Sequence, residues 1–241
     1  MNLIAAVLVA LALHHPAAPR PDVPGSWRIT LNAAPAALAK WPTFIGPFHA
    51  DGELACYSPS NIVPHIVPHA SYLALRVTPV PGTCKNARRP YTGSMILSHG
   101  RFEQQDGLWE ARIWFAATTG GTIYDWPAWW VGGGGHELDI AECMNGLVYQ
   151  VAHQPDHPQF ISRGVHVTAG WHNYAVRITA REVSWWIDGH QVAHLYSTVF
   201  GRAKMFAILD MSVHKPTIWN HPPRRVPTLM KVAWVRAWVR I

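Results

Sequence analysis

Val183-Ser184-Trp185-Trp186-Ile187-Asp188-Gly189 is the clearest β-hairpin signal in this chain. Its first five residues are mostly β-branched or aromatic, which is typical of a β-strand. The Asp-Gly pair that follows is typical of a two-residue hairpin turn, and Gln191 to Leu195 supplies the second strand. A similar run, Tyr174 to Ile178, comes just before. The segment therefore predicts a hairpin that is preceded by another strand.

Further runs with strand character recur along the chain. They include Ser71 to Thr78, Leu108 to Ala116 and Lys231 to Ile241, whereas long amphipathic helices are hard to find. The 20 prolines and 18 glycines are spread along the whole length. Many alternating strands broken by turn residues favour two packed antiparallel sheets. We therefore expect an all-β sandwich.

The length of 241 residues suits one domain with a sizeable core, and we find no repeat. Leu3 to Leu13 is an apolar stretch with the length of a signal-peptide core, too short to span a bilayer. We expect residues 1–25 to be an export segment and linker, residues 26–241 to be a single β-sandwich domain, and the protein to be secreted. An apolar N-terminal strand or a lipid-facing anchor is the alternative. No other segment is long and apolar enough to span a membrane.

The net charge of +6 admits nucleic acid or an anionic surface as a partner. The lysines and arginines are dispersed, however, and form only the short pairs Arg88-Arg89 and Arg224-Arg225. A basic chain without a basic stripe is more often solvated than bound to phosphates. We therefore expect no nucleic-acid partner.

The three cysteines cannot all pair with one another. Cys56 and Cys84 flank the expected strand at Ser71 to Thr78, and they could form a disulfide in an exported protein. No two cysteines have the spacing of metal ligands, and the 15 histidines lack a third ligand at useful spacing. We expect no metal site and no cofactor.

Glu137-Leu138-Asp139-Ile140-Ala141-Glu142 places three carboxylates in a run that otherwise reads as a buried strand. Carboxylates are among the side chains least often buried, so three in an apolar strand indicate a shared polar site. Alternation puts Glu137 and Asp139 on one face, and one β-bulge would turn Glu142 onto the same face. Cys143, the next residue, would then point into the core. We expect a row of three acids along a concave face.

Such a row is suited to glycosidic bond cleavage with retention, which needs two carboxyl groups about 5–5.5 Å apart. Glu137 would attack the anomeric carbon, and Glu142 would protonate the leaving oxygen and later activate water. Asp139 would hydrogen-bond the nucleophile and help to keep the protonation states apart. A calcium site or a surface acidic strand is the alternative. The apolar flanks and the preceding run of four glycines favour the catalytic interpretation.

At these acids the sequence resembles the family-16 glycoside hydrolases, in the branch with a bulged E-x-D-x-x-E motif that includes the laminarinases. The similarity covers residues 71–241. Beyond the acidic run it rests on five elements that occur in the family's order: Gly107 to Ile113, Trp126 to Trp130, Trp171 to Val176, Trp186 to Gly189, and Val232 to Trp238.

The resemblance implies a jelly-roll β-sandwich with an endo-acting cleft for a β-linked polysaccharide. It gives Glu137, Asp139 and Glu142 the same roles as the reasoning from their chemistry. It also implies four substrate-binding residues: Trp126 and Trp130, which would stack on sugar rings, and Arg112 and His153, which would line the cleft. Most of the 13 tryptophans, including Trp185, Trp234 and Trp238, are expected to pack in the core.

Two departures from the family pattern change these expectations. Ala233 stands where many members carry an acidic residue that holds a structural calcium, so we do not expect that metal. The segment from Met211 to Pro227 does not match the family's glycine-rich return strand, and we expect it to reshape one end of the cleft.

Together these observations predict a secreted, monomeric, retaining endo-β-glycosidase whose substrate is a β-linked polysaccharide, with β-1,3-glucan as the first choice. Galactans of the agar or carrageenan type remain open, and the positive charge would suit sulfated polymers. Transglycosylation on the same site also remains open. An alternative from another class is a non-catalytic carbohydrate-binding sandwich, which would have no chemical need for three acids. A cell-wall scaffold protein is a poorer alternative, because the sequence has no repeat or sorting signal.

Overall fold

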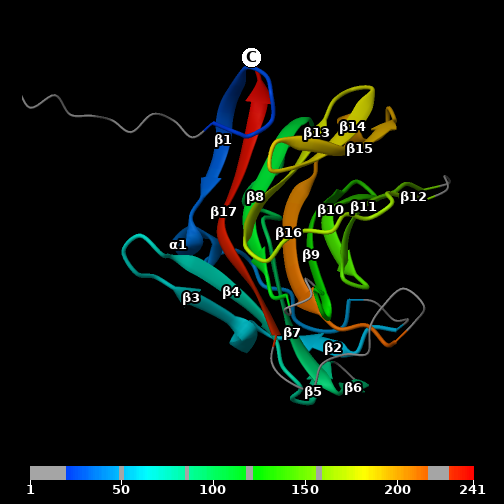
Figure 1. Ribbon diagram of the computed structural model, residues 1–241. Helices are drawn as coiled ribbons and strands as arrows, with labels where there is room; N and C mark the ends of the chain where they lie inside the picture. Colours follow the sequence, from blue (N-terminus) through cyan, green and yellow to red (C-terminus); the bar gives the residue numbers. More distant parts are fainter. Residues whose placement is uncertain (1–19, 49–51, 85–86, 118–121, 156–158, 217–227) are drawn as a thin grey trace, which may run out of the picture.

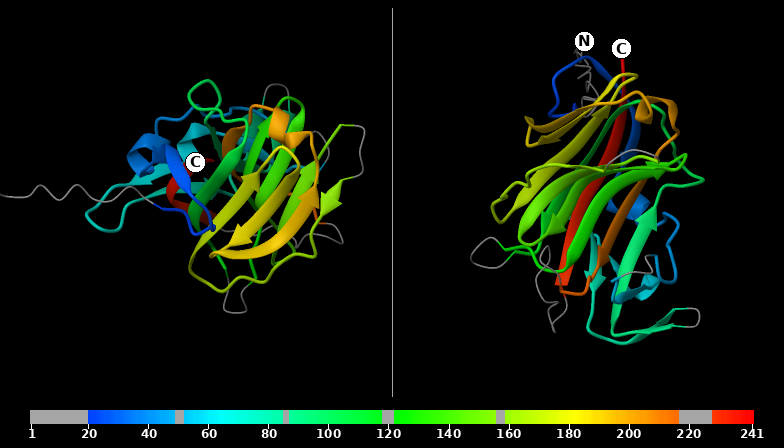
Figure 2. Two further views of the ribbon diagram at one scale, coloured as in Figure 1. Left: turned by 90° about the horizontal axis from the view of Figure 1, so that it is seen from above. Right: turned by 90° about the vertical axis from the view of Figure 1, so that its right-hand side faces the viewer.

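The computed structural model describes residues 20–48, 52–84, 87–117, 122–155, 159–216 and 228–241. These residues form two large, mostly antiparallel sheets that stack on each other, together with a small two-stranded ribbon (Figures 1 and 2). The all-β jelly-roll sandwich expected from the sequence is confirmed. Within the described residues, no helix has the length and apolar character needed to cross a bilayer.

The eight-stranded sheet is built around the long strand β17 (Thr228–Arg240). One side of β17 pairs first with β4 (Tyr72–Val77) and then with β1 (Trp27–Ala33), and the other side pairs with β8 (Gly107–Phe115). Figure 1 shows β17 in red beside the blue β1. The remaining strands of this sheet are β3 (Ile62–His65), β13 (Trp171–Ile178), β14 (Glu182–Ile187) and β15 (His190–Tyr196).

The seven-stranded sheet has the order β12-β11-β10-β9-β16-β7-β2, and only its last pair, β7 with β2, is parallel. Its strands are β2 (Ala55–Tyr57), β7 (Tyr91–Leu97), β9 (Trp126–Gly133), β10 (His136–Met144), β11 (Leu147–His153), β12 (Phe160–Ile161) and β16 (Phe206–Ser212). The smaller elements are α1 (Pro35–Leu38), β5 (Gly82–Cys84), β6 (Ala87–Arg89) and the 3-10 turns η1 (Pro59–Asn61) and η2 (Phe200–Arg202).

The predicted hairpin and the predicted disulfide are both present. Strands β14 and β15 pair antiparallel across Asp188-Gly189, where both residues have positive φ angles of 48° and 75°, as a tight hairpin turn requires. A disulfide joins Cys56 of β2 to Cys84 of β5, with the two Cα atoms 5.6 Å apart. It ties the ribbon to the edge of the seven-stranded sheet.

The main hydrophobic core lies between the two sheets. Trp109 and Ile113 from β8 pack in one cluster with Trp129 and Leu138 from the other sheet. Trp185 is buried as expected, and it belongs to the same cluster.

A smaller core covers the outer face of the eight-stranded sheet, where Trp238 packs with Val23. Val23, which the sequence analysis placed in a linker, is therefore buried, and the packed part of the chain begins ahead of residue 26. Trp234 is only partly buried, and the guanidinium of Arg236 lies 4.1 Å from its ring centre. The expected export stretch, Leu3 to Leu13, lies outside the described residues.

Candidate active site

Strand β10 carries all three acids and contains the expected bulge. Glu137 pairs with His153 of β11 and Asp139 with Val151, but the register then shifts so that Glu142 pairs with Tyr149. Strand β10 thus has one more residue than its partner between these two pairs. The shift lets all three acids line one pocket, while Cys143 is buried in the core as predicted.

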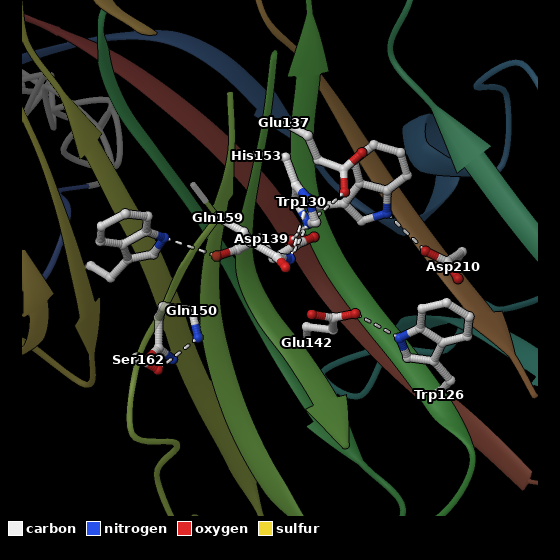
Figure 3. Close-up of polar contacts among 11 residues, drawn as sticks. Trp126, Trp130, Glu137, Asp139, Glu142, Gln150, His153, Gln159, Ser162 and Asp210 are labelled. Atoms are coloured by element: carbon white, nitrogen blue, oxygen red, sulfur yellow. Dashed lines mark hydrogen bonds and ion pairs between the residues drawn. The ribbon is translucent and has the colours of Figure 1, made fainter. Parts of the chain in front are cut away.

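The pocket lies on the face of the seven-stranded sheet that points away from the main core (Figure 3). It runs across the strands, since its lining comes from β10, β9, β16, β7 and β2 in turn, and from the segment ahead of β2. Besides the three acids, the lining residues are Phe48, Tyr57, Met95, Trp126, Ala128, Trp130 and Asp210.

Trp126 and Glu142 meet at one end of the row of acids. The indole Nε1 of Trp126 donates a hydrogen bond of 2.9 Å to Glu142 Oε1, as Figure 3 shows. Burial raises the pKa of Glu142, and the hydrogen bond from Trp126 acts in the opposite direction because it stabilises the carboxylate. The His153 imidazole also lowers this pKa. The ring of His214 lies 5.2 Å from that of Trp126.

His153 lies between the other two acids. Its Nε2 atom is 3.4 Å from Glu137 Oε1 and 3.3 Å from Asp139 Oδ2. Burial raises the pKa of Glu137, while the imidazole lowers it and the nearby Glu142 raises it again. His153 thus contacts two of the acids that line the pocket, but it is not itself one of the lining residues.

Asp139 is the most buried of the three acids, with 5% of its side chain exposed. Burial raises its pKa well above the usual range, and the neighbouring Glu142 and Glu137 add to the effect because like charges disfavour ionisation. Its backbone oxygen accepts a hydrogen bond of 2.9 Å from Trp185 Nε1, which fixes the bulged strand to the core. These effects favour the protonated form of Asp139 more than they would for an exposed aspartic acid.

The structure adds a fourth carboxyl group that the sequence analysis missed. Asp210 of β16 lines the pocket and accepts hydrogen bonds from Trp130 Nε1 at 2.8 Å and from Tyr57 OH at 3.1 Å. Burial raises its pKa well above the usual range. The available signal was a lone acid in the apolar run Phe206 to Ser212, the same signal that marks the acidic run of β10.

Of the four predicted substrate-binding residues, Arg112 is not brought to this pocket. It lies on β8 of the other sheet, where its Nη1 atom donates a hydrogen bond of 3.1 Å to Asn173 Oδ1. Its neighbours Ala111 and Ile113 point into the core, so Arg112 faces the outer side of that sheet. Trp126 and Trp130 line the pocket, although Trp130 is only 6% exposed.

Glu137, Asp139 and His153 could hold a metal ion, because each brings one ligand atom within 4.8 Å of the others. Among the described residues this is the one group of that kind. Part of the unusual segment from Met211 to Pro227, which was expected to reshape one end of the cleft, lies outside the described residues, at residues 217–227.

The β-sandwich of this chain is similar to that of several solved structures. The chain matches the laminarinase catalytic domain of Thermotoga maritima with a TM-score of 0.75 at 20% identity, over 90% of this chain and 99% of that one. It has the family-16 glycoside hydrolase fold. The endo-β-1,3-glucanase of Pyrococcus furiosus matches with a TM-score of 0.76 at 20% identity, over 92% and 99% of the two chains.

A third match is SCLam, a non-specific endo-β-1,3(4)-glucanase from family GH16, with a TM-score of 0.75 at 17% identity over 91% and 93% of the two chains. No protein-family profile and no curated protein sequence matches this chain. At these identities the likeness concerns the fold alone, and a shared fold does not fix a shared chemistry.

Proposed function

We propose that this protein is a retaining endo-β-glycosidase that hydrolyses a β-linked glucan, with β-1,3-glucan as the preferred substrate. The observation that carries the proposal is the bulge in β10, which gathers Glu137, Asp139 and Glu142 in one pocket. A pure binding site has no chemical need for three crowded acids whose pKa values are all raised.

In the first step Glu137 acts as the nucleophile. Its carboxylate attacks the anomeric carbon, the bond to the leaving sugar oxygen breaks, and Glu142 gives its proton to that oxygen. Burial favours the protonated form of both Glu137 and Glu142, and the His153 imidazole favours the ionised form of both. The imidazole lies 3.4 Å from Glu137 Oε1, which supports the role of Glu137 as the ionised partner. A proton on Asp139 would let it donate to the Glu137 carboxylate and hold it in place.

In the second step water releases the sugar. Glu142, now ionised, takes a proton from water, and the water oxygen bonds to the anomeric carbon. The ester bond to Glu137 breaks, and both acids return to their starting states. The product keeps the configuration of the substrate because the anomeric carbon is inverted twice.

The choice of glucan rests on the similar solved structures, which are described as laminarinases and endo-β-1,3-glucanases. We further propose that the enzyme is secreted, because a disulfide such as Cys56–Cys84 persists in an oxidising compartment.

The test is release of reducing ends from laminarin, mixed-linkage glucan, agarose and carrageenan, with Glu142→Gln as the control. Release from one polymer by the wild type, lost in the variant, would support the proposal and name the linkage. No release from any polymer, with retention of a polymer in a pull-down, would instead indicate a carbohydrate-binding protein.

A further inference from the structure

Asp210 lines the pocket, but both of its carboxyl oxygens accept hydrogen bonds from other side chains. Oδ1 accepts from Trp130 Nε1 at 2.8 Å, and Oδ2 accepts from Tyr57 OH at 3.1 Å. The residue is only 6% exposed. Figure 3 shows Asp210 beside the indole nitrogen of Trp130, on the side away from Asp139. An acid used in this way is suited to fix its neighbours rather than to react.

A second buried acid, Glu53, acts on the same group of side chains. Its Oε1 accepts from Ser212 Oγ at 2.8 Å, and its Oε2 accepts from the backbone N–H of Phe48 at 3.0 Å. The ring of Phe48 packs against Trp130, with 5.7 Å between ring centres. Glu53 thus fixes the segment that covers Trp130, while Asp210 fixes the indole nitrogen.

Trp130 connects this buried network to the row of acids. It pairs with Asp139 across β9 and β10 and with Ile208 across β9 and β16. A Cβ atom added at Gly132 would lie 3.2 Å from the Trp130 ring, so the glycine leaves room for the indole. The ring is therefore constrained at its nitrogen, by Phe48 and by the backbone of its own strand.

We propose that Asp210 is a positioning residue, which fixes the indole of Trp130 as the wall of the pocket beside Asp139 so that a sugar ring is aligned with the catalytic acids. The inference rests on the proposed glycosidase function. A carboxylate fits this task because its two oxygens accept from the indole and the phenol together, whereas an amide has one accepting oxygen. Misplacement of a positioning group by a small distance can reduce turnover strongly.

The kinetic test is a double-mutant cycle between Asp210→Leu and Trp130→Phe, with kcat/KM on the best polymer of the panel as the readout. We expect Asp210→Leu to lower kcat/KM by about tenfold to a hundredfold. In the Trp130→Phe background it should cause no further loss, because the group through which it acts is gone. A full additional loss in that background would show that Asp210 acts independently of Trp130 and would overturn the inference.

Asp210→Asn is the conservative variant and Glu110→Gln the matched control. Asparagine keeps one oxygen for the indole, so kcat/KM should stay within about threefold of the wild type. Glu110 is a buried acid of the other sheet, and its replacement should leave kcat/KM unchanged. Should Asp210→Leu not fold, Asp210→Ser replaces it, since a hydroxyl is too short to reach the indole.

A readout without substrate separates this inference from the proposed function. The contribution of Trp130 to the near-ultraviolet circular dichroism spectrum is the difference between the wild type and Trp130→Phe. Asp210→Leu should reduce that contribution and Asp210→Asn should preserve it. An unchanged contribution in Asp210→Leu would contradict the positioning role even if the wild type cleaved no polymer.

Discussion

Trp126 Nε1 donates a hydrogen bond of 2.9 Å to Glu142 Oε1, so a tryptophan that lines the pocket also binds the carboxyl group that we propose as the acid/base. The bond favours the ionised form of Glu142, against the effect of its burial. The side chain proposed to contact the sugar therefore also affects the proton proposed to be transferred. Two predictions for the pH profile of kcat/KM follow, one from this hydrogen bond and one from the position of His153 beside Glu137.

Trp126→Phe should shift the alkaline limb of kcat/KM to higher pH. Glu142 must be protonated to act as the acid, and loss of the hydrogen bond raises its pKa further. The acid limb, which reports ionisation of Glu137, should move much less. Steady-state kinetics across pH checks this, and an alkaline limb that stays in place or moves down would contradict the role of the bond.

His153→Asn should move both limbs of the profile to higher pH. The imidazole lowers the pKa of both Glu137 and Glu142, so its removal raises both. The matched control is His194→Asn, since His194 pairs with Glu182 at 3.1 Å on the other sheet. That variant should have the wild-type profile. An unchanged acid limb in His153→Asn would mean that the histidine does not assist the nucleophile.

In the wild type, ionisation of Glu110 should lower the free energy of unfolding at neutral pH, and Glu110→Gln should remove this effect. Burial raises the pKa of Glu110 to about 7, and the nearby carboxylate of Asp22 adds to it. Below pH 4.5, the ordinary pKa, Glu110 is protonated in both the folded and the unfolded chain, so its ionisation does not change the free energy of unfolding. Between that pH and about 7 the unfolded chain ionises first, and stability falls by about 3 kcal/mol.

Urea unfolding at pH 5 and pH 8 measures the effect of Glu110. The difference between the two pH values should be smaller in Glu110→Gln than in the wild type by a few kcal/mol at most. Glu103→Gln, a change of an exposed acid, should leave the difference unchanged. Equal differences in the wild type and Glu110→Gln would show that Glu110 ionises normally in the folded protein.

Removal of the disulfide should destabilise the fold by about 3 kcal/mol, because the bond closes a loop of 28 residues in the unfolded chain. The double variant Cys56→Ser/Cys84→Ser should unfold at lower urea than the oxidised wild type. Reductant should lower the urea midpoint of the wild type to that of the variant, and it should leave the midpoint of the variant unchanged. A wild type that is indifferent to reductant would show that the cysteines are not paired in solution.

The shared site of Glu137, Asp139 and Glu142 could be predicted from the sequence because the residues that form it are close together in the chain. Three carboxylates within six residues of an apolar strand require a shared site, and the bulge between Asp139 and Glu142 follows from the need to bring them to one face. The hairpin at Asp188-Gly189 could be predicted for the same reason, since its turn type depends on two adjacent residues.

The rest of the site depends on the order of strands in the sheet, which sequence alone did not reveal. Tyr57 and Asp210 are 153 residues apart in the chain, and they meet because β2, β7 and β16 are neighbours. The same limit explains Arg112. Alternation showed that it faces away from Ala111, but not to which sheet β8 belongs.

The most direct test of the central claim is the anomeric configuration of the first product, followed by proton NMR as the wild type cleaves laminarin. Double displacement at Glu137 predicts that the β-anomer of the new reducing end appears first and that the α-anomer forms only later by mutarotation. Initial release of the α-anomer would mean a single displacement by water, and it would contradict the assignment of Glu137 as the nucleophile.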